Sequence, residues 1–393
     1  MARTRILEKT PGYPEPVSSF GFRLTHTEGQ ARRGEMQTPH GSVETPAFMP
    51  VGTRGAVKAI TAQQLQDLGA EIILGNTYHL YLKPGDSLIA RCGGLHRFMG
   101  WDRPILTDSG GYQIFSLGAM RKISEEGARF QSHLDGSSHM LTPEKAVEIQ
   151  EALGSDIAMV LDECIPPDAT RDYVRNSTER TIRWAERCLG ARRKADQLMF
   201  GIIQGGLFDD LRQSCIDAMS ALPFEGFAVG GLGVGEGEDQ LYRIGSLTVA
   251  RLPAERPRYL MGVGRPQDIL QAVRAGFDMF DCVIPTRNAR NGALFTWQGK
   301  INIKRAEFAR DSRPLDENCG CYCCRNFSRA YLRHLYMAGE ILSAQLNSLH
   351  NLYFYHRLMD KCREAIRVGQ PELWPQLAEP DGDAQAQTTQ EDS

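Results

Sequence analysis

Short apolar runs recur along the chain from about residue 47, and a stretch with a helical pattern follows most of them. Strands that alternate with helices in this way form right-handed βαβ units with a parallel sheet. Eight such units close most simply into a (β/α)8 barrel, which is the α/β fold that we expect here. The eight runs cover residues 47–51, 71–74, 105–107, 157–161, 198–203, 226–229, 259–263 and 277–283.

Several of the helices between these runs have recognisable starts. Thr61 is placed to cap a helix over 61–69, and Thr142 followed by Pro143 is typical of a helix N-terminus. Further helices are predicted over 171–195, 208–222 and 265–276. Before the first run, a hairpin is predicted from Phe20 onward with its turn at 39–41, and a smaller hairpin over 128–137 turns at Asp135 and Gly136.

Polar residues stand where several of the apolar runs end. In a (β/α)8 barrel all strand C-termini open at one mouth, where catalytic groups gather. Side chains that are adjacent in no part of the sequence are therefore expected to meet there. The polar residues at these positions are Asn76, Asp108, Asp162, Gln204 and Asp281.

The last of these runs is followed by a cationic segment. Asp281 lies near the end of the run, and residues 286–291 are predicted to form a polar loop that carries Arg287 and Arg290. A carboxylate beside a cationic loop suits a substrate that carries phosphate. Residues 286–333 hold ten Lys or Arg against four Asp or Glu, within a chain of net charge −3. This local excess favours a nucleic-acid partner.

The bulk composition is that of a globular protein without a membrane span. The chain has 393 residues, of which 41% are hydrophobic and 24% are charged. It contains no run of about 18 apolar residues, and its N-terminus has no apolar segment typical of a secretory signal. Its ten cysteines are irregularly spaced, which favours reduced thiols and a cytoplasmic location.

Four of the cysteines are clustered at Cys319, Cys321, Cys323 and Cys324. In a cytoplasmic protein, thiols at this spacing most often bind zinc in a closed structural site of four ligands. The spacing alone does not select the fourth ligand. The candidates are Cys323, His334, His350 and His356, of which the last two fall on a helix predicted over 342–359.

Taken together, the motifs resemble the tRNA-guanine transglycosylases, also called queuine tRNA-ribosyltransferases. The resemblance runs from about residue 20 to about residue 360 and keeps the order of the family's motifs. The matching stretches are TDSGGYQ at 107–113, SHLDG at 132–136, LDEC at 161–164, GIIQGG at 201–206, VGGL at 229–232, MGVG at 261–264, FDCVIPTRNARNG at 280–292 and the cysteine cluster.

The resemblance implies a barrel with a zinc subdomain and a base-exchange reaction. In this family, guanine at the wobble position of tRNAs with GUN anticodons is replaced by 7-aminomethyl-7-deazaguanine, a step of queuosine biosynthesis. By resemblance, Asp281 is the nucleophile that forms a covalent ribosyl intermediate, and Asp108 is the general acid/base. The resemblance also implies a structural zinc ion held by Cys319, Cys321, Cys324 and His350. Cys323 departs from the family's pattern, because it is a thiol at a position where a non-ligand is expected and is therefore able to compete with Cys324.

The same resemblance assigns substrate and RNA contacts. Asp162 is expected to accept from the N1 and N2 groups of guanine, Gln204 and the Gly231 N–H to donate to O6, and Tyr112 and Met261 to sandwich the ring. The expected base-binding residues are Asp108, Ser109, Gly110, Gly111, Tyr112, Asp162, Gln204, Gly231, Leu232 and Met261. The expected RNA-binding residues are Gly262, Val263, Gly264, Arg265, Pro266, Gln267, Asp268, Thr286, Arg287, Asn288, Ala289 and Arg290.

These expectations define a domain plan and one alternative function. Residues 1–18 are expected to be a flexible lead, 19–367 the barrel domain with the zinc subdomain at about 298–360, and 378–393 a disordered acidic tail. A homodimer is expected by resemblance. The alternative is a non-catalytic RNA-binding partner subunit of the same fold, which should lack Asp108 or Asp281, whereas this chain has both. An unrelated sugar glycosidase would need neither the cationic segment nor the cysteine cluster.

Overall fold

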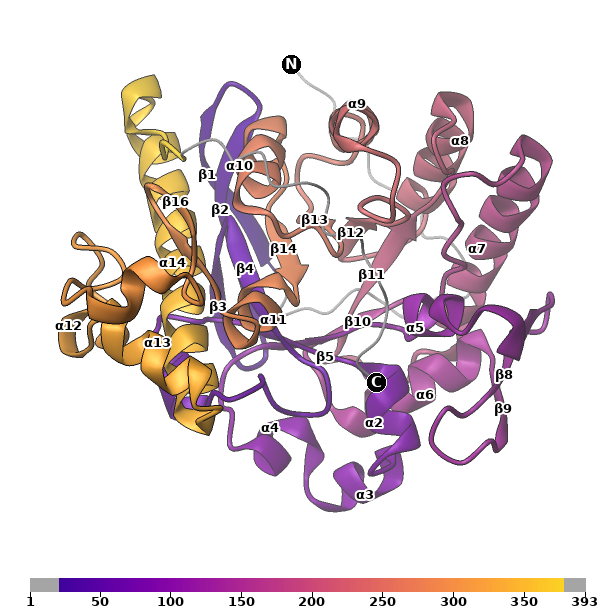
Figure 1. The fold of residues 1–393 in the computed structure, drawn as a ribbon. Coiled ribbons are helices and arrows are strands. Elements are labelled where there is room, and N and C mark those ends of the chain that lie inside the picture. Colours follow the sequence, from indigo (N-terminus) through magenta and orange to yellow (C-terminus); the bar gives the residue numbers. More distant parts are fainter. Residues whose placement is uncertain (1–20, 378–393) are drawn as a thin grey trace.

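The computed structural model describes residues 21–377, so the predicted N-terminal lead and acidic tail lie outside the described residues. Its centre is a closed barrel of eight parallel strands in which each strand pairs with the next in the chain (Figure 1). The predicted (β/α)8 barrel is thereby confirmed. The barrel strands are β4 (Ala47–Gly52), β5 (Ile73–Gly75), β6 (Ile105–Thr107), β10 (Ile157–Met159), β11 (Leu198–Ile203), β12 (Gly226–Val229), β13 (Arg258–Leu260) and β14 (Met279–Cys282).

Helices surround the barrel and bury their apolar faces against it. Thr142 caps one of them by accepting from the Lys145 N–H, as its position before Pro143 predicts. Three short helices between β5 and β6 had no counterpart among the predicted elements. The helices of this layer are α1 (Ala62–Asp67), α2 (Thr77–Leu82), α3 (Asp86–Arg91), α4 (Gly94–Met99), α5 (Gly111–Ser116), α6 (Pro143–Leu153), α7 (Arg171–Ala191), α8 (Asp209–Ser220), α9 (Glu238–Val249) and α10 (Pro266–Ala275).

Two antiparallel sheets extend the barrel. The first consists of β1 (Gly21–Glu28), β2 (Ala31–Thr38) and β3 (Gly41–Thr45), and the second of β7 (Arg121–Ile123), β8 (Ala128–Gln131) and β9 (Ser138–Leu141), preceded by a 3-10 turn, η1 (Gly118–Met120). The second sheet contains the small hairpin predicted from Asp135 and Gly136.

The first sheet is fixed to the amino-terminal end of the barrel by buried charges. Arg32 of β2 donates to the carboxylate of Asp278, just before β14, and Asp278 also accepts from the Arg258 N–H. In the turn after β2, His40 donates to Asp156, which precedes β10 and also accepts from the N–H of Ile105. These contacts hold the first sheet against the amino-terminal end of the barrel, opposite the mouth at which the strands end.

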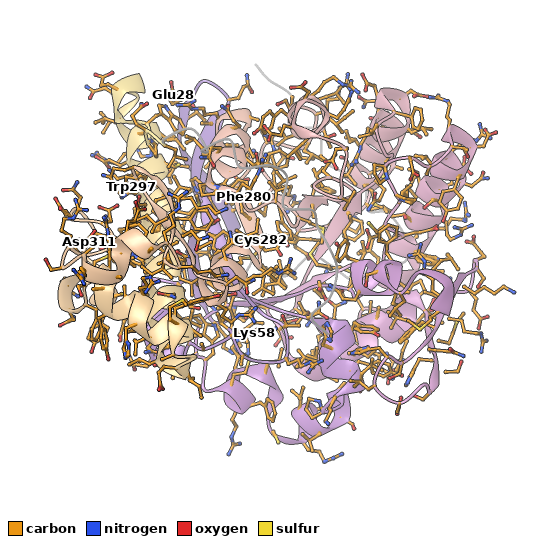
Figure 2. All side chains as sticks on the ribbon, in the orientation of Figure 1. Glu28, Lys58, Phe280, Cys282, Trp297 and Asp311 are labelled. Atoms are coloured by element: carbon orange, nitrogen blue, oxygen red, sulfur yellow. The ribbon has the colours of Figure 1, made fainter. Side chains whose placement is uncertain are left out.

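The chain after β14 forms a subdomain on the side of the barrel. A long helix, α14, lies against β1, β2 and β4, and Figure 1 shows it beside the amino-terminal strands, far from it in sequence. The elements are α11 (Ile284–Arg290), β15 (Ala293–Thr296), β16 (Gly299–Asn302), η2 (Ala306–Arg310), α12 (Tyr322–Asn326), α13 (Arg329–Met337), α14 (Ile341–Val368) and η3 (Pro371–Leu373). Figure 2 shows Trp297 and Asp311 in this region and Phe280 and Cys282 in the barrel beside it.

One local prediction is wrong. Residues 286–291 were predicted as a polar loop, but most of this segment belongs to the helix α11. Pro285 stands in its first turn, a position that suits proline because its N–H is not needed there. Pro285, Thr286 and Ala289 are buried against α14, so tertiary packing stabilises a helix that local polarity disfavours.

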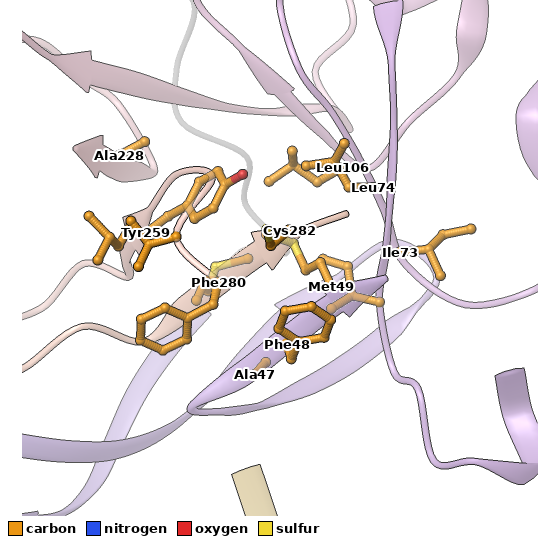
Figure 3. Close-up of a cluster of buried hydrophobic side chains, with 14 of the residues drawn as sticks. Ala47, Phe48, Met49, Ile73, Leu74, Leu106, Ala228, Tyr259, Phe280 and Cys282 are labelled. Carbon is orange, nitrogen blue, oxygen red and sulfur yellow. The ribbon is translucent and has the colours of Figure 1, made fainter. Parts of the chain in front are cut away.

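The core fills the barrel and continues beneath α14. Phe48, Phe280 and Tyr259 are buried and lie within one cluster (Figure 3). Tyr355 of α14 packs on Phe48 with ring centroids 4.7 Å apart, which joins the subdomain to the barrel core.

Candidate active site at the barrel mouth

Three carboxylates meet at the carboxyl-terminal mouth of the barrel. Asp108 follows β6, Asp162 follows β10, and Asp281 is the third of the four residues of β14. They are close enough that Asp281 and Asp162 each raise the pKa of Asp108 by charge repulsion. The structure thus brings together three residues that are far apart in sequence, as the positions of the strand ends predict.

Asp108 is held by the segment after β5. Its two carboxylate oxygens accept from Asn76 Nδ2 at 2.6 Å and from the Thr77 N–H at 2.9 Å, and the Thr77 hydroxyl donates to its carbonyl. Burial raises the pKa of Asp108 to about 7, with the bond from Thr77 opposing the shift and the charge of Asp281 adding to it. A group with a pKa near neutrality can both donate and accept a proton.

Asp281 has one oriented oxygen and one open oxygen. Its Oδ1 accepts from the Tyr259 hydroxyl at 2.5 Å and from the Gly262 N–H at 2.8 Å. Its Oδ2 accepts no hydrogen bond from the residues that the structure describes. Burial raises its pKa, while Tyr259 and Gly262 lower it by stabilising the ionised form. Tyr259 was missed by the sequence reasoning because a tyrosine inside a strand carries no signal of its own.

Asp162 and Gln204 form a buried polar pair beside these two carboxylates. Gln204 Nε2 donates to Asp162 Oδ2 at 2.7 Å, and Gln204 Oε1 has no partner among the described residues. Burial raises the pKa of Asp162 to about 6, and the bond from Gln204 opposes this. The pair offers one unused acceptor and unused donor capacity, which suits a ligand with both kinds of group.

Glycines bring the backbone against this pair. A Cβ on Gly111 would lie 2.6 Å from Asp162 Oδ1, and one on Gly231, which has a φ of +68°, would lie 2.6 Å from Gln204 Oε1. Both positions therefore suit glycine, because the backbone lies directly against the Asp162–Gln204 pair.

The remaining residues expected to bind the base line the same region with different exposure. Tyr112 of α5 is 50% exposed, whereas Ser109 and Leu232 are buried and Met261 is half-buried. Beyond Leu232, the Glu236 carboxylate accepts from the N–H groups of Gly233 and Val234, which fixes that turn.

The two segments expected to contact RNA border Asp281. In α11, the side chain of Arg287 is exposed and Ala289 is buried. In the segment 262–268, Arg265 forms ion pairs with Asp268 at 2.7 Å and Glu238 at 2.6 Å. Asp268 is buried and also accepts from the Tyr242 hydroxyl, so its contacts in the free protein are internal.

A separate cluster of metal-binding side chains joins the cysteine segment to α14. The Sγ atoms of Cys319, Cys321 and Cys324 lie 3.7, 3.5 and 3.3 Å from His350 Nδ1. A tetrahedral zinc ion with bonds of about 2.3 Å to sulfur and about 2.0 Å to nitrogen separates these atoms by about 3.5 Å. His350 Nε2 donates to the Phe295 carbonyl, which leaves Nδ1 free to bind a metal. Neither Cys323, which is buried, nor His334 or His356 belongs to the cluster.

None of the helices within residues 21–377 combines the length and the hydrophobicity of a membrane span.

Comparisons with known proteins point to one family. A family model described as queuine tRNA-ribosyltransferase matches residues 27–377. Proteins of that name from Solidesulfovibrio magneticus, Thermoanaerobacter sp. and Fusobacterium nucleatum are 59%, 57% and 55% identical over 350, 354 and 349 residues. These alignments cover 88%, 89% and 88% of this chain and 94% of each relative.

Proposed function

The chain belongs to the queuine tRNA-ribosyltransferase family, and from this premise we propose its reaction. It exchanges guanine at the wobble position of tRNAs with GUN anticodons for 7-aminomethyl-7-deazaguanine, a step of queuosine biosynthesis. The observation that carries the proposal is the grouping of Asp108, Asp162 and Asp281 at one mouth, each with different partners.

In the proposed mechanism Asp281 is the nucleophile. Tyr259 and the Gly262 N–H orient its Oδ1, which leaves Oδ2 for attack on C1′ of the wobble nucleotide. The C1′–N9 bond of guanine breaks as the C1′–O bond to Asp281 forms. Attack of the incoming base on C1′ then releases the carboxylate, and two inversions retain the configuration of the sugar.

Asp108 moves the protons in both steps. With a pKa of about 7 it is partly protonated at neutral pH, so it can give a proton to departing guanine. The resulting carboxylate then accepts the proton that the incoming base loses. Asn76 and Thr77 orient its two oxygens from the N-terminus of α2.

The target base must leave its stack to reach this site, so a fitted pocket is required. Asp162 accepts from N1 and N2, Gln204 and the Gly231 N–H donate to O6, and Tyr112 and Met261 cover the ring faces. The Leu232 carbonyl accepts from the aminomethyl group of the incoming base. Ser109, Gly110 and Gly111 complete the pocket, and the close approach of Gly111 to Asp162 supports this assignment.

The tRNA lies over the two segments that flank Asp281. Arg287, Asn288 and Arg290 of α11 present polar atoms there, and the basic excess over residues 286–333 supports contact with the RNA backbone. The full proposed RNA-binding set is Gly262, Val263, Gly264, Arg265, Pro266, Gln267, Asp268, Thr286, Arg287, Asn288, Ala289 and Arg290.

Cys319, Cys321, Cys324 and His350 would hold one structural zinc ion per chain. With four protein ligands the ion would take no part in the chemistry and would tie the cysteine segment to α14. Residues of about 298–360 then act as a zinc subdomain of a barrel domain spanning 19–367. We place the protein in the cytoplasm, where tRNA and reduced thiols are found.

We also propose a homodimer. The junction of α13 and α14 supports it, because Met337 and Ile341 expose 59% and 85% of their surface. Light scattering at micromolar concentration should give twice the chain mass for the wild type and for Leu88→Asp, and a lower mass for Ile341→Asp. A monomeric wild type would contradict the dimer.

The reaction is tested with labelled guanine and a tRNA that has a GUN anticodon. Wild type and Asp217→Ala, which changes an exposed carboxylate on α8, should incorporate label into the RNA. Asp281→Ala should incorporate none, and a wild type that incorporates none would favour the non-catalytic partner subunit.

A further inference from the structure

The helix α14 carries three buried polar side chains at a spacing of four residues. Asn347, Asn351 and Tyr355 are each fully buried. Residues four apart on an α-helix lie on one face, so these side chains form a row along the side of α14. Buried polar groups are retained where they have partners, and here the partners are main-chain groups of α11, β15 and the segment 262–268.

Two of the three side chains hold α11, which begins two residues after β14. Asn351 Nδ2 donates to the Pro285 carbonyl at 2.9 Å and to the Ala293 carbonyl at 3.1 Å, and its Oδ1 accepts from the Phe295 N–H. Asn347 Nδ2 donates to the Ala289 carbonyl at 3.3 Å. Both ends of α11 are therefore attached to α14.

The third side chain holds the segment 262–268. The Tyr355 hydroxyl donates to the Gly264 carbonyl from a fully buried position. Gly264 has no room to move toward β14, because a Cβ built on it would lie 2.1 Å from the Cβ of Cys282. Two residues earlier, Gly262 donates to Asp281, so the same segment also orients the carboxylate.

The metal cluster lies next to this row. His350 precedes Asn351 directly, and Phe295 pairs with both, its carbonyl with His350 and its N–H with Asn351. A metal ion held by His350 Nδ1 would therefore act on α14 at the point where the row contacts β15.

We propose that Asn347, Asn351 and Tyr355 are positioning residues for tRNA. They set α11 and the segment 262–268 at the separation and angle that the anticodon arm requires. They do so from their buried positions on α14, without contacting the RNA. The inference rests on the proposed function, since it takes these two segments as the RNA-contacting surface. It gives the subdomain a part in substrate binding besides its contribution to stability.

The test uses Tyr355→Phe, which removes one hydroxyl and keeps the ring on Phe48, and Asn347→Ala, which is mild because Asn347 Oδ1 has no partner among the described residues. Ser348→Ala is the matched control, because Ser348 is equally buried on α14 and its hydroxyl has no hydrogen-bond partner among residues 21–377. Each full-length protein is measured for metal content, melting temperature, the Kd of tRNA without added base, and the separate KM values of tRNA and guanine.

Tyr355→Phe should raise the Kd and KM of tRNA about tenfold, because one buried hydrogen bond is lost. Asn347→Ala should raise them less, since its bond is longer. The KM of guanine and the metal content should stay at wild-type values, and Ser348→Ala should match the wild type throughout. A role in stability alone would instead lower the active fraction and leave both KM values unchanged. If the wild type exchanges guanine and Tyr355→Phe has an unchanged KM for tRNA, the positioning role is wrong. An inactive wild type would instead overturn the proposed function.

Discussion

Removing the Tyr259 hydroxyl should shift the pH dependence of the reaction. In the wild type, this hydroxyl and the Gly262 N–H stabilise the ionised form of Asp281, against a burial effect that raises its pKa. In Tyr259→Phe only Gly262 remains as a donor to Oδ1. The ionised carboxylate loses a stabilising bond and the neutral form does not, so the pKa of Asp281 must rise.

The magnitude follows from the kind of bond. A hydrogen bond to a charged group contributes about 1.5–3 kcal/mol, and about 1.4 kcal/mol corresponds to one pKa unit. The acidic limb of kcat/KM should therefore move to higher pH by about one to two units. At the pH optimum kcat should fall about tenfold. The reason is that the carboxylate loses one of the two bonds that orient it through Oδ1 while Oδ2 attacks C1′.

The assay is guanine exchange over the pH range in which each protein stays folded, with wild type, Tyr259→Phe and Tyr336→Phe. Tyr336 serves as the control because it lies on α13, and its ring contacts Lys304. An acidic limb that stays in place in Tyr259→Phe, or that moves equally in Tyr336→Phe, would refute the reasoning.

Three further outcomes are expected. Gly111→Ala should raise the KM of guanine far more than that of tRNA, because the added Cβ meets the Asp162 carboxylate at 2.6 Å; equal changes in both KM values would contradict this. His350→Ala should lose the metal and lower the melting temperature, and chelation should do the same to the wild type, since a closed site contributes folding free energy; full metal stoichiometry in the variant would disprove the ligand assignment. Asp156→Asn should lower the free energy of unfolding by about 2 kcal/mol at neutral pH, as measured by urea denaturation. Burial raises the pKa of Asp156, but the bonds from His96, Ile105 and His40 outweigh this effect and lower it. The stability that Asp156 contributes is therefore present above its unfolded-state pKa and is lost as the pH falls through its folded-state pKa. The difference in unfolding free energy between wild type and Asp156→Asn should disappear in acid, and a constant difference would contradict this.

Much of the barrel could be predicted because its strands are short, buried and bounded by polar residues. The residues that end the runs, such as Asp108 and Asp281, were identified because a parallel barrel sends every strand end to one mouth. The sequence does not show at which end of a strand a carboxylate acts. Asp156 and Asp278 precede their strands and bind His40 and Arg32 of the sheet β1–β3, at the amino-terminal end of the barrel. Only the fold distinguishes them from the carboxylates at the mouth.

Other features depend on contacts between distant segments. The helix α11 was predicted as a loop, since its polar residues give no sign that α14 covers Pro285 and Ala289. The spacing of the cysteines left the fourth metal ligand open among one cysteine and three histidines, and only the resemblance to the family indicated His350. In the folded protein His350 lies beside the three thiols, and the other candidates do not belong to this group.

The proximity of Asp108 and Asp281 has a consequence for the proposed reaction. While Asp281 is ionised, its charge helps to keep Asp108 protonated, as the first step requires. When Asp281 becomes a neutral ester, that repulsion ends just as Asp108 becomes a carboxylate by giving its proton to guanine. Release of Asp281 in the second step restores the charge as Asp108 takes a proton from the incoming base. At each stage one of the two groups is anionic, so Asp108 and Asp281 do not carry a negative charge at the same time.

This alternation can be measured without turnover. In Asp281→Asn the repulsion is absent at all pH values, so the pKa of Asp108 should fall below its wild-type value of about 7. Carbon NMR of aspartate labelled at the carboxyl group reports that titration directly, and a variant that lacks Asp108 assigns the signal. A pKa of Asp108 that is unchanged or higher in Asp281→Asn would mean that the charge of Asp281 does not contribute to it. The two carboxylates would then act independently, and the proton transfer would need no coupling to the covalent step.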